Sequence, residues 1–260
     1  MSRGEPETRG AASETPPARG LAAEREAATR AQPHAHITLV RHGEPDWSPR
    51  GGSAVDDPGL TPFGQGQASC TAALLGDQRF DALYVSPYRR ALETAAIVGE
   101  AIGIQPVTVD SLAEVGVAVA GFTQEEVDRY FVEGSSRPLS EHWDGWPGAE
   151  SFHDFHKRVT EGISDVLGRH ACRPRREHDF TVWDLPEIKP SIAVVAHGGT
   201  NAVVLTHLLD IRPVPWEWIR FETGLAAIST LQARPVGTGG HVWSLQNFNR
   251  EDHLFEAGLR

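Results

Sequence analysis

The sequence predicts an α/β protein, built as a three-layer α/β/α sandwich around a mostly parallel central sheet. Two short apolar runs, residues 37–40 and 192–196, carry the main signal, because the first stops abruptly at Arg41-His42-Gly43 and the second at His197-Gly198-Gly199. Such runs are typical of buried parallel strands. Strand-like and helix-like segments alternate around them, which favours helices on both faces of one sheet.

Six short apolar segments are expected to form strands, and five longer segments are expected to form helices. The expected strands cover residues 37–40, 82–86, 106–109, 192–196, 226–232 and 242–246. The expected helices cover residues 62–76, 89–102, 124–133, 150–169 and 199–209. Their alternation along the chain is what predicts the layered sandwich.

Helix starts carry the clearest local signals. Thr61 stands before Pro62, which suits an N-cap residue followed by proline at the first helical position. Thr123 and Glu126 have the spacing of a capping box. The helix expected at 150–169 places its large apolar side chains on one stripe, so that it should cover one face of the sheet.

Two segments interrupt the alternation. Residues 134–148 contain Pro, Ser and Gly together with Trp143 and Trp146. We favour these tryptophans as core anchors of an irregular segment, and the alternative is that they wall a substrate pocket. Residues 169–190 form a polar connection that is long for a compact domain and is therefore expected to be functional or mobile. The glycine-rich residues 237–240 are expected to form a hairpin turn.

Length and composition indicate one sizeable α/β domain, residues 34–260, preceded by a disordered extension, residues 1–33. The 260-residue chain has a formal net charge of −11. The extension contributes none of this charge, since five Arg balance five Glu there, and it contains too few large apolar residues to pack. An acidic domain disfavours a nucleic-acid partner. A phosphate ligand would need a local positive pocket in this negative field.

The sequence gives no indication of a membrane partner, a disulfide framework or a metal site. No stretch approaches the roughly 20 apolar residues of a membrane helix, and residues 1–33 lack the apolar core of a signal peptide. Cys70 and Cys172 are expected to be free thiols of a cytoplasmic protein. His153 and His156 have helical spacing but no clear third ligand, so that neither a metal nor a cofactor is expected.

Two histidines are expected to meet at one edge of the sheet. His42 and His197 each follow a buried strand directly, and the carboxyl ends of parallel strands meet at the edge where ligands bind. Arg41 stands beside His42. Two imidazoles and a guanidinium at one edge suit an anion, and phosphate is the first candidate.

Five segments resemble, in the expected order, the motifs of the histidine phosphatase superfamily, which includes cofactor-dependent phosphoglycerate mutases. They are Arg41-His42-Gly43-Glu44, residues 60–68, Ser86-Pro87-Tyr88-Arg89-Arg90-Ala91, Leu112-Ala113-Glu114 and His197-Gly198-Gly199-Thr200. The resemblance extends from about residue 37 to about residue 254, nearly the whole expected domain.

The resemblance implies a nucleophilic histidine between arginines. His42 would form a phosphohistidine, which requires a neutral ring whose other nitrogen is bound, usually to a backbone carbonyl. Arg41 and Arg90 would clamp the phosphoryl oxygens, and His197 would be a further donor in the transition state. Glu114 would protonate the leaving oxygen and then activate water, which requires burial to outweigh the nearby arginines.

Further binding residues are expected around this set. Gly198 opens a helix whose amide end favours an anion. Ser48 replaces an asparagine that is frequent in the family after the first loop, and either Ser48 or Thr61 is expected to contact the phosphate. The chain also departs from the family after Glu114, where residues 116–121 replace a Gly-x-Trp-x-Gly-like stretch.

The favoured function is a metal-independent phosphomonoesterase that acts through a phosphohistidine on a small phosphorylated metabolite. The alternatives are a phosphoglycerate-mutase-like phosphotransferase, and a non-catalytic module that binds a phosphorylated ligand. The retained nucleophile and arginines argue against the module. The expected partner is a small phosphorylated substrate, with neither nucleic acid nor membrane, and a homodimer is left open. The catalytic core does not select the substrate.

Overall fold

The computed structural model describes Met1, residues 34–49 and residues 53–260; apart from Met1, the extension expected to be disordered (1–33) lies outside these ranges. The strands are β1 (His36–Arg41), β2 (Ala82–Val85), β3 (Val107–Thr108), β4 (Arg173–Glu177), β5 (Phe180–Asp184), β6 (Ser191–Ala196), β7 (Ile228–Val236) and β8 (Gly240–Arg250). The helices are α2 (Pro62–Gly76), α3 (Arg89–Ile102), α4 (Gln124–Ser135), α5 (Phe152–Arg169), α6 (Gly198–Leu208), α7 (Glu217–Arg220) and α8 (Asp252–Glu256), with 3-10 helices η2 (Asp110–Leu112) and η3 (Leu139–Asp144).

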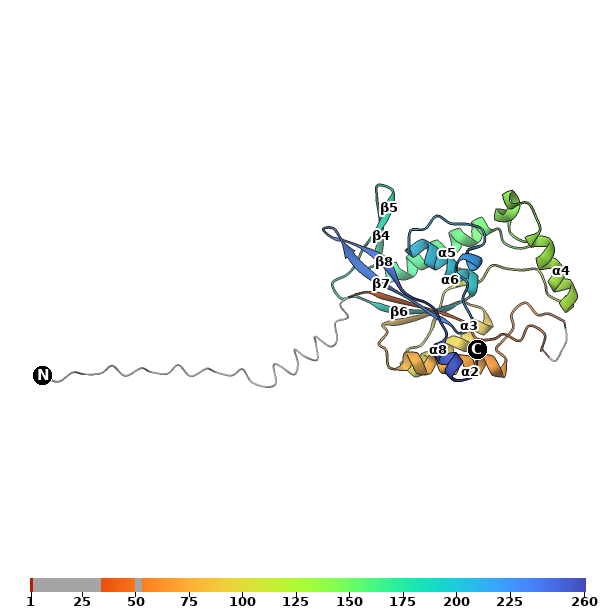
Figure 1. Cartoon of the computed structure of the whole chain (residues 1–260), viewed down its shortest axis with the longest axis horizontal. Coiled ribbons are helices and arrows are strands. Elements are labelled where there is room, and N and C mark those ends of the chain that lie inside the picture. Colours follow the sequence, from red (N-terminus) through yellow and green to blue (C-terminus); the bar gives the residue numbers. More distant parts are fainter. Residues whose placement is uncertain (2–33, 50–52) are drawn as a thin grey trace. The chain divides into compact units, whose positions relative to one another are not determined.

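The predicted three-layer sandwich is confirmed, with one eight-stranded sheet between two helical layers (Figure 1). α5 and α6 cover one face, and α2 and α3 cover the other. Successive residues of a strand point to opposite faces, so Leu39 of β1 joins the core under α5 whereas Val40 joins the core under α3. Among the helices that the structure describes, none combines the length and apolar character that crossing a bilayer requires.

The sheet is mixed rather than mostly parallel. β3, β2, β6 and β1 pair in parallel, and β7, β8, β5 and β4 continue the sheet in antiparallel pairs. Short connections join β4 to β5 and β7 to β8, and two strands joined by a tight turn must run in opposite directions. The predicted hairpin turn between β7 and β8 is confirmed, and Gly237 and Gly239 adopt the positive φ that such turns favour.

The expectation of a polar connection at residues 169–190 is wrong, because this segment contains the β4–β5 hairpin at the edge of the sheet. Val182 and Trp183 of β5 point to opposite faces of the strand, and both are buried. The more exposed side chains of the hairpin are mostly charged and pair across it, as Arg175 does with Asp184. A hairpin at the edge of the sheet therefore has a polar composition that resembles a loop.

The local helix signals are confirmed. Thr61 accepts a hydrogen bond from Gly64 N, with Pro62 at the first helical position, and Thr123 and Glu126 form both bonds of a capping box. α2 and α3 have the predicted bounds. The short helices α7 and α8 were not predicted, because one turn contains no periodic pattern.

The loop after β1 lies against the first turn of α2 without space for a side chain. A Cβ atom on Gly43 would overlap the carbonyl oxygen of Gly64, and a Cβ on Gly64 would overlap the carbonyl oxygen of Glu44. The amide of Thr61 donates to the same Glu44 oxygen at 2.9 Å. This backbone contact fixes where His42 leaves the sheet.

We expect Gly64→Ala to lower the free energy of unfolding by about 1–3 kcal/mol, because the added methyl group must push two backbone segments apart. Gly76→Ala is the matched control, since it lies in the same helix and its Cβ would meet no atom closer than 3.7 Å. Urea unfolding of both variants measures the difference. Equal stabilities would contradict the close contact.

Candidate active site

The carboxyl ends of β1 and β6 place two histidines side by side. The two strands pair in parallel with Arg41 opposite Ala196, so the residues that follow them, His42 and His197, are neighbours. Their ring centroids are 5.0 Å apart, and both side chains are buried. A pocket of about 1210 Å³ opens at this edge, with Arg41, His42, Arg90, Glu114 and Gly198 in its lining.

His42 is held as a neutral imidazole. Its Nδ1 lies 2.7 Å from the carbonyl oxygen of Gly43, which only accepts, so the ring proton is on Nδ1. Arg90 Nε then donates to the bare Nε2 at 3.3 Å. Burial, followed by the charges of Arg90 and Arg41, holds the pKa of His42 well below its ordinary value. The ring therefore presents an unprotonated Nε2, as a nucleophile requires.

Arg90, not its neighbour Arg89, is the buried arginine of α3. Arg90 is 4% exposed and lies over the rings of Tyr88 and Trp47, at 4.8 and 5.1 Å. Arg89 is exposed and pairs with Glu93 on the surface of the helix. The predicted register of this motif therefore agrees with the geometry.

Three buried nitrogen atoms around His42 have no hydrogen-bond partner among the described residues. They are Nε of Arg41, one terminal nitrogen of Arg90 and Nδ1 of His197. Arg41 also donates to the carbonyl of Thr223, which holds its guanidinium in place. Buried donors are normally satisfied, so a phosphoryl group bound beside His42 would satisfy the two arginine nitrogens, whose residues line the pocket.

His197 contributes no surface to the pocket lining, so the structure does not bring this predicted donor into contact with the pocket. Its Nε2 is 2.6 Å from the hydroxyl of Ser86, and burial is the largest cause that holds its pKa well below the ordinary value. Ser86 thus orients His197. The sequence analysis assigned Ser86 no role, although it starts the segment that contains Arg90.

Glu114 lines the pocket just after η2, and its carboxylate accepts from the amides of Gly199 at 2.8 Å and Val115 at 3.0 Å. Burial raises the pKa of Glu114, whereas these two hydrogen bonds and the charges of Arg90 and Arg41 lower it; burial dominates. The carboxyl therefore keeps its proton to a higher pH than an ordinary glutamate. This is the balance that the acid role requires.

The first turn of α6 brings this carboxylate and a guanidinium together. A Cβ on Gly199 would lie 2.5 Å from an oxygen of Glu114, and a Cβ on Gly198 would lie 3.6 Å from the guanidinium of Arg41. The glycine pair therefore leaves room for both side chains at the start of the helix.

Arg158 of α5 supports the segment before Glu114, and the sequence analysis assigned it no role. One terminal nitrogen of its guanidinium donates to the carbonyls of Ser111 and Ala113, both at 3.0 Å, and the rest of the group binds Glu150. These carbonyls come immediately before Glu114. Arg158 therefore holds in place the segment that positions Glu114.

Ser48 and Thr61 are not brought to the lining of the main pocket. Ser48 lines a smaller neighbouring cavity of about 230 Å³. The hydroxyl of Thr61 caps α2 and donates to Glu44 at 2.8 Å, so both of its hydrogen-bonding roles are already used. A phosphate contact from either residue would need a rearrangement of its segment.

The two tryptophans of the 134–148 segment have different roles. Trp143 stacks on His153 of α5, at 4.4 Å between centroids, and acts as an anchor. Trp146 packs on Phe152 and also lines the pocket, so that both interpretations apply to it. Within residues 34–49 and 53–260, no group of three His, Cys, Asp or Glu side chains forms a metal-ligating cluster.

A family model described as the histidine phosphatase superfamily, branch 1, matches residues 37–246. The chain belongs to the histidine phosphatase superfamily. The predicted resemblance is thereby confirmed over most of the chain.

Curated relatives of this histidine phosphatase include a phosphatase and a mutase. Phosphoserine phosphatase 1 of Hydrogenobacter thermophilus is 31% identical over 137 residues, which are 52% of this chain and 65% of that protein. A 2,3-bisphosphoglycerate-dependent phosphoglycerate mutase of Cytophaga hutchinsonii is 24% identical over 198 residues, which are 72% of this chain and 84% of that protein.

Solved structures share the fold. The mycobacterial glucosyl-3-phosphoglycerate phosphatase superimposes with a TM-score of 0.62 at 24% identity, covering 83% of this chain and 99% of that one. The phosphoserine phosphatase of Entamoeba histolytica, in its complex with 3-phosphoglyceric acid, gives 0.59 at 25% identity, covering 85% and 99%.

We expect Arg90→Ala to lower kcat/KM for p-nitrophenyl phosphate by about 10²–10³-fold, because it removes a buried positive charge beside His42. Arg89→Ala provides the matched control, since it removes an exposed arginine from the same turn and should leave turnover near that of the unmodified protein. A larger loss from Arg89→Ala than from Arg90→Ala would show that the wrong arginine has been assigned.

Proposed function

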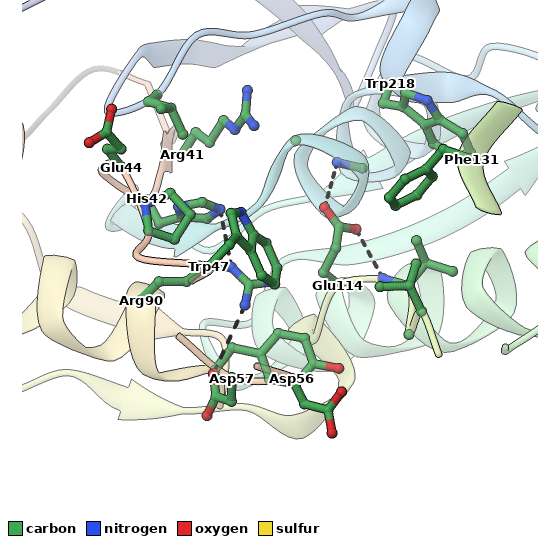
Figure 2. Close-up of a pocket in the computed structure, with 18 of the residues that line it drawn as sticks. Arg41, His42, Glu44, Trp47, Asp56, Asp57, Arg90, Glu114, Phe131 and Trp218 are labelled. Carbon is green, nitrogen blue, oxygen red and sulfur yellow. Dashed lines mark hydrogen bonds and ion pairs between the residues drawn. The ribbon is translucent and has the colours of Figure 1, made fainter. Parts of the chain in front are cut away.

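We propose that this histidine phosphatase hydrolyses phosphomonoesters of small metabolites through a phosphohistidine on His42, without a metal. One observation carries the proposal: a neutral imidazole with a bare Nε2 shares a pocket with the buried guanidinium of Arg90, the half-buried guanidinium of Arg41 and a carboxyl of raised pKa. In Figure 2 Glu114 stands across from His42, and the guanidinium groups of Arg41 and Arg90 extend toward the space between them.

In the first step Nε2 of His42 attacks phosphorus, and the bond from phosphorus to the leaving oxygen breaks. The electron pair of that bond goes to the leaving oxygen, which takes the proton of Glu114 and departs as an alcohol. Arg41 and Arg90 stabilise the charge on the phosphoryl oxygens. The carbonyl of Gly43 keeps the Nδ1 proton and supports the positive charge that the ring acquires.

In the second step water attacks the phosphohistidine from the side that the alcohol has left. Glu114, now a carboxylate, accepts a proton from this water, and the bond between phosphorus and Nε2 breaks with its electrons returning to the ring. Inorganic phosphate leaves, and His42 is again neutral. The net reaction consumes one water for each ester.

The arginines outside the pocket lining favour hydrolysis over the mutase alternative, which needs a second anion site. Arg137 donates to backbone carbonyls of its own segment, and Arg175 and Arg176 are paired with acidic side chains at the β4–β5 hairpin. Among the described residues, Arg41 and Arg90 are the only arginines or lysines in the pocket lining.

Trapping of the phosphoenzyme tests the proposed function. After rapid mixing with ³²P-labelled p-nitrophenyl phosphate, we expect label on His42, steady release of phosphate, and neither in His42→Ala. Label on another residue would overturn the proposed nucleophile. Conversion of 3-phosphoglycerate into its isomer without release of phosphate would favour the mutase.

The acid role of Glu114 predicts a dependence on the leaving group. Glu114→Ala should slow the burst of alcohol from an alkyl phosphate by about 10²–10⁴-fold, because an alkoxide leaves poorly without a proton. The burst of p-nitrophenolate should suffer much less, since this anion is stable. Pre-steady-state bursts are the correct measurement, because the same substitution slows the later attack by water. Equal losses with both substrates would remove Glu114 from the acid role.

A further inference from the structure

The pocket is much larger than a phosphoryl group. Its volume of about 1210 Å³ exceeds the range of about 300–1000 Å³ that small-molecule sites usually occupy. His42, Arg41 and Arg90 define the phosphoryl end. In the proposed reaction Glu114 protonates the leaving oxygen, so the organic part of the substrate extends to the Glu114 side.

Three aromatic side chains form a wall on that side. Figure 2 shows Phe131 and Trp218 beyond Glu114 as viewed from His42, and Trp146 completes this aromatic wall. The ring centroids of Phe131 and Trp146 are 5.4 Å apart, as are those of Trp146 and Trp218. The residues come from α4, from the segment before α5 and from α7.

The aromatic wall is packed against a buried ring and a helix. Trp146 and Trp218 both rest on Phe152, each at 5.0 Å between centroids, and Phe152 is buried. A Cβ on Gly134 of α4 would overlap the ring of Trp146, so this helix lies directly against the tryptophan. Flat apolar faces fixed in this way favour a flat apolar ligand.

The remaining charges of the pocket are negative. Glu44, Asp56, Asp57 and Glu222 line it, whereas its permanent positive charges among the described residues are the two arginines at the phosphoryl end, and Arg90 already lies 3.9 Å from a carboxylate oxygen of Asp57. A leaving group with a carboxylate or a second phosphate would meet like charge and find no cation of its own among these residues.

We infer that the substrate is the phosphate ester of an alcohol that carries no negative charge and presents a flat apolar ring to the aromatic wall. This inference rests on the proposed phosphatase reaction. It separates the protein from an enzyme that acts on phosphoserine or phosphoglycerate, since both of those compounds carry a carboxylate next to the ester. A positive charge on the alcohol is compatible with the acidic side chains that line the pocket.

Matched phosphate esters test the inference on the unmodified protein. The series is ethyl phosphate, 2-phenylethyl phosphate, and 2-phenylethyl phosphate with an aminomethyl or a carboxyl group at the para position. We expect kcat/KM to rise by about 10-fold or more from ethyl phosphate to 2-phenylethyl phosphate. The aminomethyl ester should have about the same kcat/KM as 2-phenylethyl phosphate, and the carboxylated ester should have a value about 10-fold lower.

Variants then assign the preference to the wall. Phe131→Ala and Trp218→Leu should each reduce the ratio of kcat/KM for phenylethyl over ethyl phosphate, and the leucine retains apolar volume while removing the flat face. Phe255→Ala is the control, because Phe255 is 72% exposed on α8 and lies outside the pocket lining. Asp56→Asn should reduce the penalty on the carboxylated ester.

The outcomes separate this inference from the proposed function. Phosphate release with no preference for the ring, or with a preference for the carboxylated ester, overturns the inference and leaves the phosphatase intact. Ratios that are the same in Phe131→Ala, Trp218→Leu and the control also overturn it. Absence of both phosphate release and label on His42 with every ester overturns the proposed function, and the inference with it.

Discussion

The site depends on one electrostatic constraint: the His42 ring must stay neutral while it is buried beside two permanent positive charges. Desolvation and the charges of Arg90 and Arg41 act in the same direction, because both disfavour an imidazolium. The Gly43 carbonyl then selects the tautomer. The hydroxyl of Thr94 links these parts, since it accepts from Gly43 N and donates to the carbonyl of Arg90.

Glu114 must keep its proton for the acid role, although it lies near the same two arginines. Positive charges that keep His42 neutral also favour the carboxylate, so the raised pKa of Glu114 exists only because burial outweighs them. Arg158 holds the segment before Glu114 in place, because its guanidinium donates to the carbonyls of Ser111 and Ala113 and to the carboxylate of Glu150. A base and an acid with pKa values displaced by environment are typical of a site for general acid–base and nucleophilic chemistry. The sandwich matters for the site because the parallel strands β1 and β6 end side by side and place Arg41, His42 and His197 at one edge of the sheet.

Much of this could be predicted from the sequence, because some signals are local. A continuous apolar strand that ends at a histidine places that histidine at the sheet edge, and the spacing within residues 86–91 distinguishes Arg90 from Arg89. Other features have no local signal. The β4–β5 hairpin has the composition of a loop because it pairs charges across an edge. Arg158 donates to backbone carbonyls, which every residue has, so no sequence pattern identifies it.

The aromatic wall is another feature that has no local signal in the sequence. Phe131, Trp146 and Trp218 are separated in the chain, and only the packing of α4, α7 and the segment before α5 brings them together. Trp146 was considered for the pocket because it lies in an irregular segment, whereas Phe131 looked like an ordinary helical residue. The substrate preference that we infer thus depends on tertiary contacts between segments that are distant in the sequence.

The most direct measurement is a pH titration of the His42 ring nitrogens by long-range ¹H–¹⁵N NMR on histidine-labelled protein, with His42→Gln to assign its signals. At pH 6.5, where an ordinary histidine is half protonated, we expect a neutral ring with the proton on Nδ1 and a bare Nε2. An imidazolium at that pH, or a neutral ring with its proton on Nε2, would contradict the electrostatic constraint on which the site depends.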